Sequence, residues 1–127
     1  MRAVDQDGFR AWLDRYFEAW ASNDPAEVAA LFAEDAVYYY ASFVEPTRGR
    51  AAIVEAWTSA PAQHEVRWSH DVLAVLGDRG IAHWQESSRF DDGRRVELDG
   101  ILVCDFDAEG RCTLHREWAN RRESRPS

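Results

Sequence analysis

The stretch FRAWLDRYFEAWASNDPAEVAALFAEDAV, residues 9–37, decides how the fold begins. Its apolar residues recur at steps of three and four, which is the spacing of one face of an amphipathic helix. They are Phe9, Trp12, Leu13, Tyr16, Phe17 and Trp20. Asp24 followed by Pro25 is typical of a helix N-cap and a first helical position. We therefore predict helices over residues 9–22 and 25–32, and then a strand at AVYYY, whose residue types favour β structure.

The remaining chain changes from helical to strand spacing near Ala62. Residues 50–59 keep helical spacing through Ile53 and Trp57, which predicts a third helix. Four extended stretches follow, separated by the turn signals GDRG, DDG and DAEG, and they predict an antiparallel meander. These stretches are residues 65–76, 81–91, 94–106 and 111–121. The predicted fold class is α+β, with three N-terminal helices packed on a strongly curved antiparallel sheet in one domain, residues 1–127.

Composition narrows the classes of partner. With 127 residues, 46% of them apolar, the chain can bury the core of one domain. Its net charge of -8 repels phosphate backbones and anionic membrane surfaces, so we expect neither nucleic acid nor membrane as a partner. No apolar run approaches the roughly 20 residues of a membrane helix, and MRAVDQDGFR lacks the apolar core of a signal peptide, which favours a cytoplasmic protein. Cys104 and Cys112 are expected to be buried thiols.

Three segments carry a resemblance to a known family: RYFEAWASNDPAEVAALFAEDAV, EPTRGRAAIVEAW and FDAEGRCTLHREW. Together with the order of predicted elements, they resemble the nuclear transport factor 2-like superfamily. Within it, the chain is similar to small SnoaL-like and ketosteroid-isomerase-like bacterial proteins. The resemblance covers roughly residues 9–121 and implies a cone-shaped α+β fold. It does not decide the activity, because the superfamily includes isomerases, dehydratases, polyketide cyclases, epoxide hydrolases and proteins without catalysis.

The last two turns predict which residues share a face of the sheet. A two-residue turn at Asp92-Gly93 pairs residues 91 and 94, and a four-residue turn at DAEG pairs residues 106 and 111. One face then carries a polar row, made of His83, Gln85, Ser87, Arg89, Leu98, Gly100, Leu102, His115, Glu117 and Ala119. The opposite face carries an apolar patch, made of Ala82, Trp84, Ile101, Val103, Leu114 and Trp118. This register also places Cys104 and Cys112 on opposite faces, which argues against a disulfide.

Two choices of inner face remain open from the residues alone. Ordinary burial would place the apolar patch against the helices and leave the polar row in water. The family resemblance implies the reverse, with the polar row lining a conical pocket and the apolar patch on the convex face. On that basis we predict a homodimer through the convex face. Its centre would be Trp84, Ile101, Val103, Leu114 and Trp118.

The helices are expected to supply the other pocket wall. The resemblance implies that Tyr16 donates a hydrogen bond to a developing oxyanion, although a core tyrosine is an equal alternative. Trp20, Tyr38, Tyr40 and Trp57 would complete an aromatic mouth. In the isomerase pattern the base is an aspartate at the position of Tyr40, and a second oxyanion donor is an aspartate at the position of Leu102. Both differences count against steroid isomerase chemistry.

The polar row suggests general acid–base catalysis. His115 or His83 could act as base with Glu117 orienting it, or Glu117 itself could be the acid or base. Ligand-binding roles are expected for Gln85, Ser87, Arg89, Gly100 and Leu102, with Gly100 leaving a hollow between Gln85 and Glu117. These groups predict a cofactor-independent lyase, isomerase or cyclase acting on a small apolar carbonyl compound.

Other interpretations of the same residues stay open. The polar groups could merely satisfy one another and bound water. His83, His115 and Glu117 also form a set of two histidines and one carboxylate that could bind a metal, although no metal is expected. A non-catalytic module that binds a hydrophobic ligand, or a protein-interaction module, is the alternative function.

Overall fold

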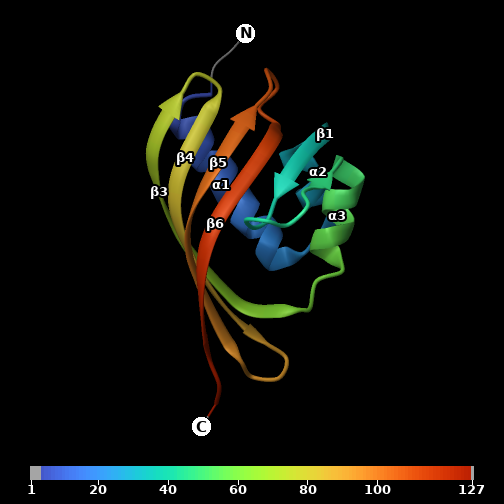
Figure 1. The fold of residues 1–127 in the computed structure, drawn as a ribbon, viewed down its shortest axis with the longest axis vertical. Helices are drawn as coiled ribbons and strands as arrows, with labels where there is room; N and C mark the ends of the chain where they lie inside the picture. Colours follow the sequence, from blue (N-terminus) through green and yellow to red (C-terminus); the bar gives the residue numbers. More distant parts are fainter. Residues whose placement is uncertain (1–3, 127) are drawn as a thin grey trace.

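The computed structural model describes residues 4–126 and places three helices on a six-stranded sheet (Figure 1). The elements are α1 (Gln6–Ser22), α2 (Pro25–Leu31), β1 (Phe32–Tyr39), β2 (Thr47–Arg48), α3 (Arg50–Thr58), β3 (Gln63–Leu76), β4 (Arg79–Phe90), β5 (Arg95–Phe106) and β6 (Cys112–Ser124). The strand order is β2-β1-β6-β5-β4-β3. The three predicted helices and the antiparallel meander are confirmed. The sheet as a whole is mixed, because β1 pairs with β6 in parallel.

The boundary between the first two helices follows from local hydrogen bonds. Asn23 adopts a left-handed conformation at φ 56, and its backbone N–H donates to the Ala19 carbonyl, which ends α1. The Asp24 side chain then accepts from the backbone N–H of Ala26 at 2.9 Å, with Pro25 at the first helical position. The SNDP sequence therefore ends one helix and starts the next within a few residues.

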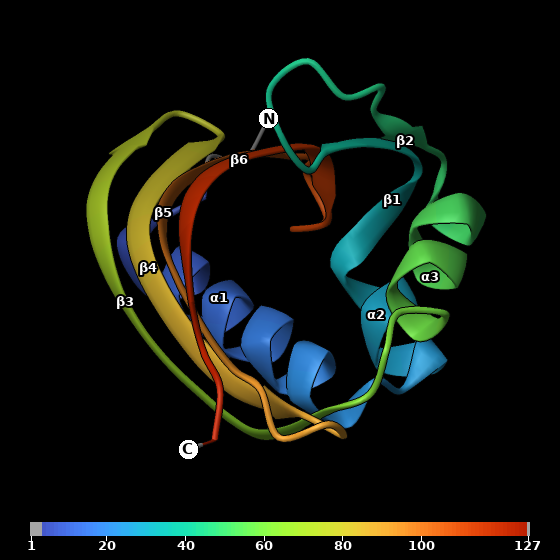
Figure 2. The ribbon, with the colours of Figure 1, turned by 60° about the horizontal axis from the view of Figure 1, so that its bottom comes forward.

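The long strands β3–β6 bend around α1, which lies inside the curve (Figure 2). The aromatic face of α1 packs on this concave face, and Phe9, Trp12, Tyr16 and Phe17 are almost completely buried. The helices α2 and α3 cover the side next to β1 (Figure 2). Among residues 4–126, no helix is both long and apolar enough to cross a membrane.

The turn between β4 and β5 is one residue longer than predicted. The backbone N–H of Phe90 donates to the Arg94 carbonyl at 2.9 Å, so residues 91–93 form a three-residue loop, with Gly93 at φ 87. Trp84 then pairs with Gly100 and Gln85 with Asp99. A shift of one residue exchanges the two faces of a strand. The predicted faces of β4 are therefore wrong.

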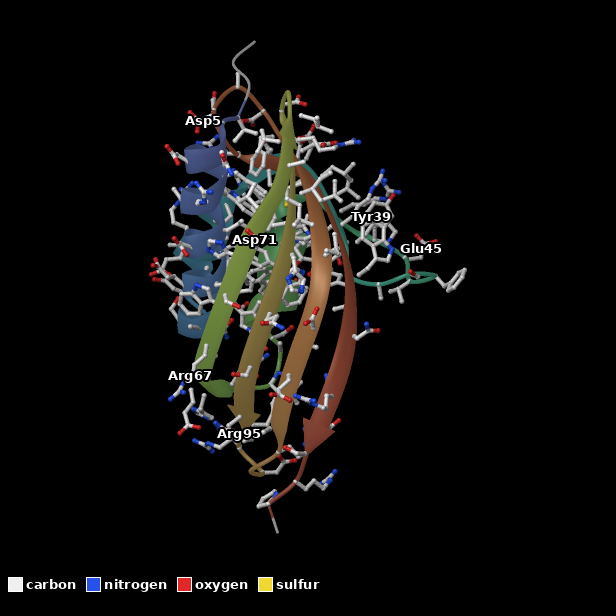
Figure 3. All side chains as sticks on the ribbon, turned by 90° about the vertical axis from the view of Figure 1, so that its left-hand side faces the viewer. Asp5, Tyr39, Glu45, Arg67, Asp71 and Arg95 are labelled. Atoms are coloured by element: carbon white, nitrogen blue, oxygen red, sulfur yellow. The ribbon has the colours of Figure 1, made fainter. Side chains whose placement is uncertain are left out.

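The consequence for β4 is an exchange of inner and outer residues. The inward side chains belong to Ala82, Trp84, Glu86 and Ser88, all of them buried. The outward side chains belong to His83, Gln85, Ser87 and Arg89. Figure 3 shows this outer face of β3–β6, with Arg67 and Asp71 on β3 and Arg95 on β5. Ordinary burial of apolar residues was the correct rule for this strand.

The faces of β6 were predicted correctly although its turn was not. The backbone N–H of Asp107 donates to the Arg111 carbonyl across a three-residue loop, and the register shifts again before Asp105 pairs with Leu114. The two changes add up to two residues, so His115 and Glu117 still point to the concave face. The shorter turn pairs Cys112 with Phe106 on the inner side, where Cys112 is buried together with Cys104. The prediction that the two cysteines occupy opposite faces is wrong.

The structure explains the glycine at residue 100 by close strand packing, not by the predicted hollow. Gly100 lies between Trp84 and Ala119, not between Gln85 and Glu117. A Cβ atom at this position would collide with the Trp118 carbonyl oxygen and lie 2.9 Å from the Ala119 Cα. The absent side chain therefore permits a close approach of β5 and β6.

We predict that Gly100→Ala destabilises the fold by roughly 2 kcal/mol or more, because the backbone of β6 must move to admit the methyl group. Urea denaturation measures this change. Gly110→Ala is the control, since its added methyl group meets nothing within 4 Å and only the φ of 80° is strained, at a cost of about 1 kcal/mol. Equal stability losses in the two variants would contradict the close approach.

Candidate active site

A cavity of about 340 Å³ lies where the C-terminal ends of α1 and α3 meet the start of β3. Its larger side chains are Tyr16, Trp20, Tyr38, Tyr40, Trp57, Gln63 and Glu117. Among the lining residues, which all belong to the described part of the chain, Glu117 is the only carboxylate. A mostly apolar wall with few convergent polar groups is typical of a small-molecule site.

Two tyrosines hold the carboxylate of Glu117. The Tyr38 hydroxyl donates to Glu117 Oε1 at 2.6 Å, and the Tyr16 hydroxyl lies 3.5 Å from the same oxygen. The two hydroxyl oxygens are themselves 2.6 Å apart. Tyr38 reaches this position because β1 runs parallel to β6 and pairs Tyr38 with His115. The cluster thus joins α1, β1 and β6.

Burial sets the ionisation of this cluster. Desolvation raises the pKa of Glu117 to about 7, although the hydrogen bonds from Tyr38 and Tyr16 offset part of the rise. Burial, together with the nearby charge of Glu117, raises the pKa of both tyrosine hydroxyls well above the ordinary range. The phenols therefore remain neutral donors while the carboxyl can gain or lose a proton near neutral pH.

His115 lies behind the tyrosines and does not line the cavity. Its ring stacks on Tyr38 with centroids 4.1 Å apart and on Tyr16 at 5.2 Å. Nδ1 is 3.9 Å from Glu117 Oε1, and neither ring nitrogen has a hydrogen-bond partner within residues 4–126. Complete burial lowers the pKa of His115 to about 3. The ring is therefore neutral at physiological pH.

Aromatic side chains complete the cavity beside the Glu117 cluster. Tyr40 packs on Tyr38 with ring centroids 4.2 Å apart, and burial raises its pKa to about 12. Its hydroxyl has no well-placed hydrogen-bond partner in the described chain, although Thr47 and Trp57 lie close enough to lower the pKa a little. At the mouth, Trp20 Nε1 donates to Gln63 Oε1 at 2.8 Å.

The comparisons with known proteins agree with this fold. A family model described as a SnoaL-like domain matches residues 13–115. The chain belongs to the SnoaL-like domain family. It is 34% identical over 112 residues to a protein named steroid Delta-isomerase from Nocardioides simplex, covering 87% of this chain and 89% of the relative. The resemblance to the nuclear transport factor 2-like superfamily is thereby confirmed.

Two solved structures share the fold at low sequence identity. The Delta 5-3-ketosteroid isomerase from Mycobacterium sp. matches with a TM-score of 0.78 and 17% identity, over 92% of this chain and 98% of that one. The epoxide hydrolase/cyclase-like enzyme SalBIII matches with a TM-score of 0.75 and 18% identity, over 91% of this chain and 93% of that one. Both place the chain in the cone-shaped α+β class.

This SnoaL-like domain brings together only some of the predicted site residues. Those that share the cavity are Tyr16, Trp20, Tyr38, Tyr40, Trp57 and Glu117. Leu102 is buried on the concave face next to Glu117 but does not line the cavity. Gly100 also lies on this face, outside the cavity lining.

The predicted residues of β4 lie on the outer face, away from the cavity. His83 Nε2 is 2.8 Å from Asp99 Oδ1, and Gln85 Nε2 donates to the other Asp99 oxygen at 2.7 Å. Arg89 contacts Glu65, and Ser87 pairs with Glu97 on the same outer surface. The three-residue turn explains all four corrections.

The alternative metal set is not assembled. His83 lies on the outer face, whereas His115 and Glu117 lie inside. Within residues 4–126, no group of three or more histidine, cysteine, aspartate or glutamate side chains is placed to hold a metal ion.

Two inward residues of β4 were not predicted to lie in the core: Trp84 was assigned to the convex face, and Glu86 was given no role. Trp84 packs against Phe17 and Trp20, and Glu86 is almost completely buried. The alternation of Ala82 and Trp84 with polar neighbours was the signal that could have placed them, because it is the ordinary pattern of a half-buried strand.

We predict that Tyr38→Phe raises the pKa of Glu117 further above 7, because the lost hydrogen bond stabilises the charged carboxylate. A titration of the Glu117 side-chain carboxyl by carbon-13 NMR measures the change. Tyr16→Phe is the matched variant and should give a smaller rise, since its hydroxyl lies 3.5 Å from the carboxylate. A fall in the pKa after Tyr38→Phe would contradict the assigned hydrogen bond.

Proposed function

We propose that this protein is a cofactor-independent enzyme that moves a proton within a small apolar ketone, with Glu117 as base and then acid. The observation that carries the proposal is the single carboxylate in an aromatic cavity, held by two phenols and with its pKa raised to about 7. Such a group accepts and returns a proton with little cost at neutral pH.

The proton transfer can be written with the side chains at hand. Ionised Glu117 removes a proton from the carbon next to the carbonyl group, and the electron pair moves onto the carbonyl oxygen as an enolate. A tyrosine hydroxyl donates to that oxygen, and we assign this role to Tyr40, which lines the cavity and whose own hydroxyl has no well-placed partner in the described chain. Protonated Glu117 then returns the proton to a different carbon of the conjugated enolate. The product is an isomer, and no redox change occurs.

The relative from Nocardioides simplex supports this class of reaction, since it is named a steroid Delta-isomerase. The replacement of two expected aspartates by Tyr40 and Leu102 speaks against a simple transfer of the isomerase site. Glu117 answers the loss of the base, because β6 supplies a carboxylate to the same cavity, and Tyr40 is the proposed donor to the oxyanion. We therefore infer an isomerase or cyclase whose base comes from β6.

His115 has a positioning role in this proposal. The neutral ring packs on both Tyr16 and Tyr38 and keeps their hydroxyls directed at Glu117. Its burial and its lowered pKa argue against a role as general base, because it neither reaches the cavity nor gains a proton near pH 7.

We predict that Glu117→Gln lowers kcat/KM by about 10²–10⁴-fold on a β,γ-unsaturated steroid ketone, because the amide cannot accept the proton. The rise in absorbance of the conjugated product measures the rate. In the unaltered enzyme, kcat/KM should increase with pH through about 7 and then level, as Glu117 must be ionised to act as base.

His83→Ala is the control and should keep full activity, since this side chain lies on the outer face. Activity that survives Glu117→Gln would refute the proposed base. Tight ketone binding without turnover by the unaltered protein would favour the alternative of a non-catalytic ligand-binding module.

We also propose that two copies associate through the outer face of the sheet. Ile101, Val103 and Leu114 are only partly buried there, and Trp118 is 47% exposed. The prediction that Trp84 belongs to this patch is wrong, because Trp84 lies in the core. A contiguous apolar patch on a sheet is a candidate for a two-fold interface.

We expect Trp118→Glu to shift the protein from dimer to monomer, since it places a charge at the centre of the proposed interface. Sedimentation velocity at micromolar concentration measures the assembly. Leu73→Glu is the matched control, because Leu73 is 54% exposed but lies on the edge strand β3. A monomer before any substitution, or a dimer that survives Trp118→Glu, would exclude this face.

A further inference from the structure

Two buried side chains on β4 with polar groups, Trp84 and Glu86, have no role in the proposed reaction. Glu86 is 3% exposed and Trp84 is 1% exposed. Among residues 4–126, the two Glu86 carboxyl oxygens and Trp84 Nε1 have no well-placed hydrogen-bond partner. The Ser88 hydroxyl lies close enough to lower the pKa of Glu86 a little. An unpaired buried carboxyl is costly and calls for an explanation such as a ligand.

The sheet register places these groups in the same interior as the Glu117 cluster. Glu117 pairs with Leu102, and Trp84 and Glu86 pair with Gly100 and Leu98 on the same concave face. From Leu102 to Leu98 is four residues along β5, or about 13 Å at ~3.3 Å per residue. The two acids thus lie on the concave face with their β5 partners about 13 Å apart, at ~3.3 Å per residue.

Trp20 connects the cavity wall to Trp84, which neighbours the second acid on β4. Its indole lines the cavity and lies 6.0 Å from the Trp84 ring, whereas Trp84 and Glu86 do not line the cavity. Trp20 is partly exposed, and a single side-chain hydrogen bond, to Gln63, fixes its Nε1. Trp20 is therefore the cavity-lining side chain that packs next to Trp84.

We propose that the pocket extends past Trp20 to a second polar subsite formed by Glu86 and Trp84, and that this subsite binds a hydroxyl group. A hydroxyl can donate to the carboxyl and accept from the indole N–H at the same time. An ammonium group has no acceptor for the indole N–H, so it fits less well. Desolvation raises the pKa of Glu86 to about 7, and both its ionised and its neutral forms keep an oxygen that accepts.

The substrate class follows from the positions of the two acids. It is an elongated apolar ketone that carries a hydroxyl group at the end away from its carbonyl. The assignment of the carbonyl end rests on the proposed function, whereas the hydroxyl subsite rests on Glu86 and Trp84 alone.

Binding of two matched ketones tests the subsite without any turnover. The probes are 4-(4-hydroxyphenyl)cyclohexanone and 4-phenylcyclohexanone, which differ only by the distal hydroxyl. Isothermal titration should show the hydroxy ketone binding about tenfold tighter to the unaltered protein, as expected for a hydrogen bond to a carboxyl group. Glu86→Met should reduce this ratio to about one, because methionine fills the space without the acceptor.

Glu117→Gln separates this inference from the proposed function. It should change the affinity of both ketones by the same factor and leave their ratio near tenfold. If Glu117→Gln abolishes catalysis and the hydroxy ketone still binds about tenfold tighter, the subsite is supported. If the unaltered protein is catalytically active but binds both ketones equally, the subsite is refuted. A ratio that depends on Glu117 and not on Glu86 would also overturn the inference, because the hydroxyl would then lie at the wrong end.

A second measurement does not depend on the folding of a variant. The carbon-13 carboxyl resonance of Glu86 in the unaltered protein should shift when the hydroxy ketone binds and stay in place with the ketone that lacks the hydroxyl. Equal affinities of the two ketones, no binding of either at millimolar concentration, or an unmoved Glu86 resonance would each overturn the proposed subsite.

Discussion

The packing of the aromatic face of α1 into the concave face of the sheet is the constraint on which the rest of the structure depends. Phe9, Trp12 and Phe17 are buried there, and each such side chain contributes roughly 1.5–3 kcal/mol of hydrophobic stabilisation. The long strands must curve around one helix to cover them (Figure 2). The resulting interior is almost entirely aromatic and aliphatic, so any polar group within it loses its water. The chemistry of the protein therefore depends on the few polar side chains that this interior encloses.

The sequence was sufficient to predict the elements and the side chains that the helices direct inward. Helical spacing fixes the direction of Tyr16 and Trp20 once the apolar face is known, and no turn length enters that argument. Strand residues are different, because their direction alternates and is counted from the adjoining turn. One extra residue in the loop closed by Gly93 was enough to move His83 and Gln85 to the outer face.

Glu117 was predicted on the correct face of β6, although the predicted register of that strand was wrong. The turn between β5 and β6 was also misjudged, but a bulge next to Asp105 added a second residue and restored the predicted face. No sequence signal identified this bulge, since neither glycine nor proline occupies residues 112–114. The hydrogen bond from Tyr38 to Glu117 could not be predicted from the sequence either. It joins residues 79 positions apart and depends on the parallel pairing of β1 with β6.

The two interior acids illustrate how one desolvated environment gives side chains different uses. Burial raises the pKa of both Glu86 and Glu117 to about 7, above the ordinary value of 4.5. A raised folded-state pKa means that the folded protein binds these protons more tightly than the unfolded chain, so this contribution to stability is present at acidic pH and is lost as pH rises through about 7. The hydroxyls of Tyr16 and Tyr38 offset part of the cost of burying the ionised carboxylate of Glu117. In the described chain, no comparable donors contact the carboxylate of Glu86. Since leucine at residue 86 would avoid the cost of burying an unpaired polar group, an unpaired carboxyl there is easier to understand as part of a binding site than as part of the core.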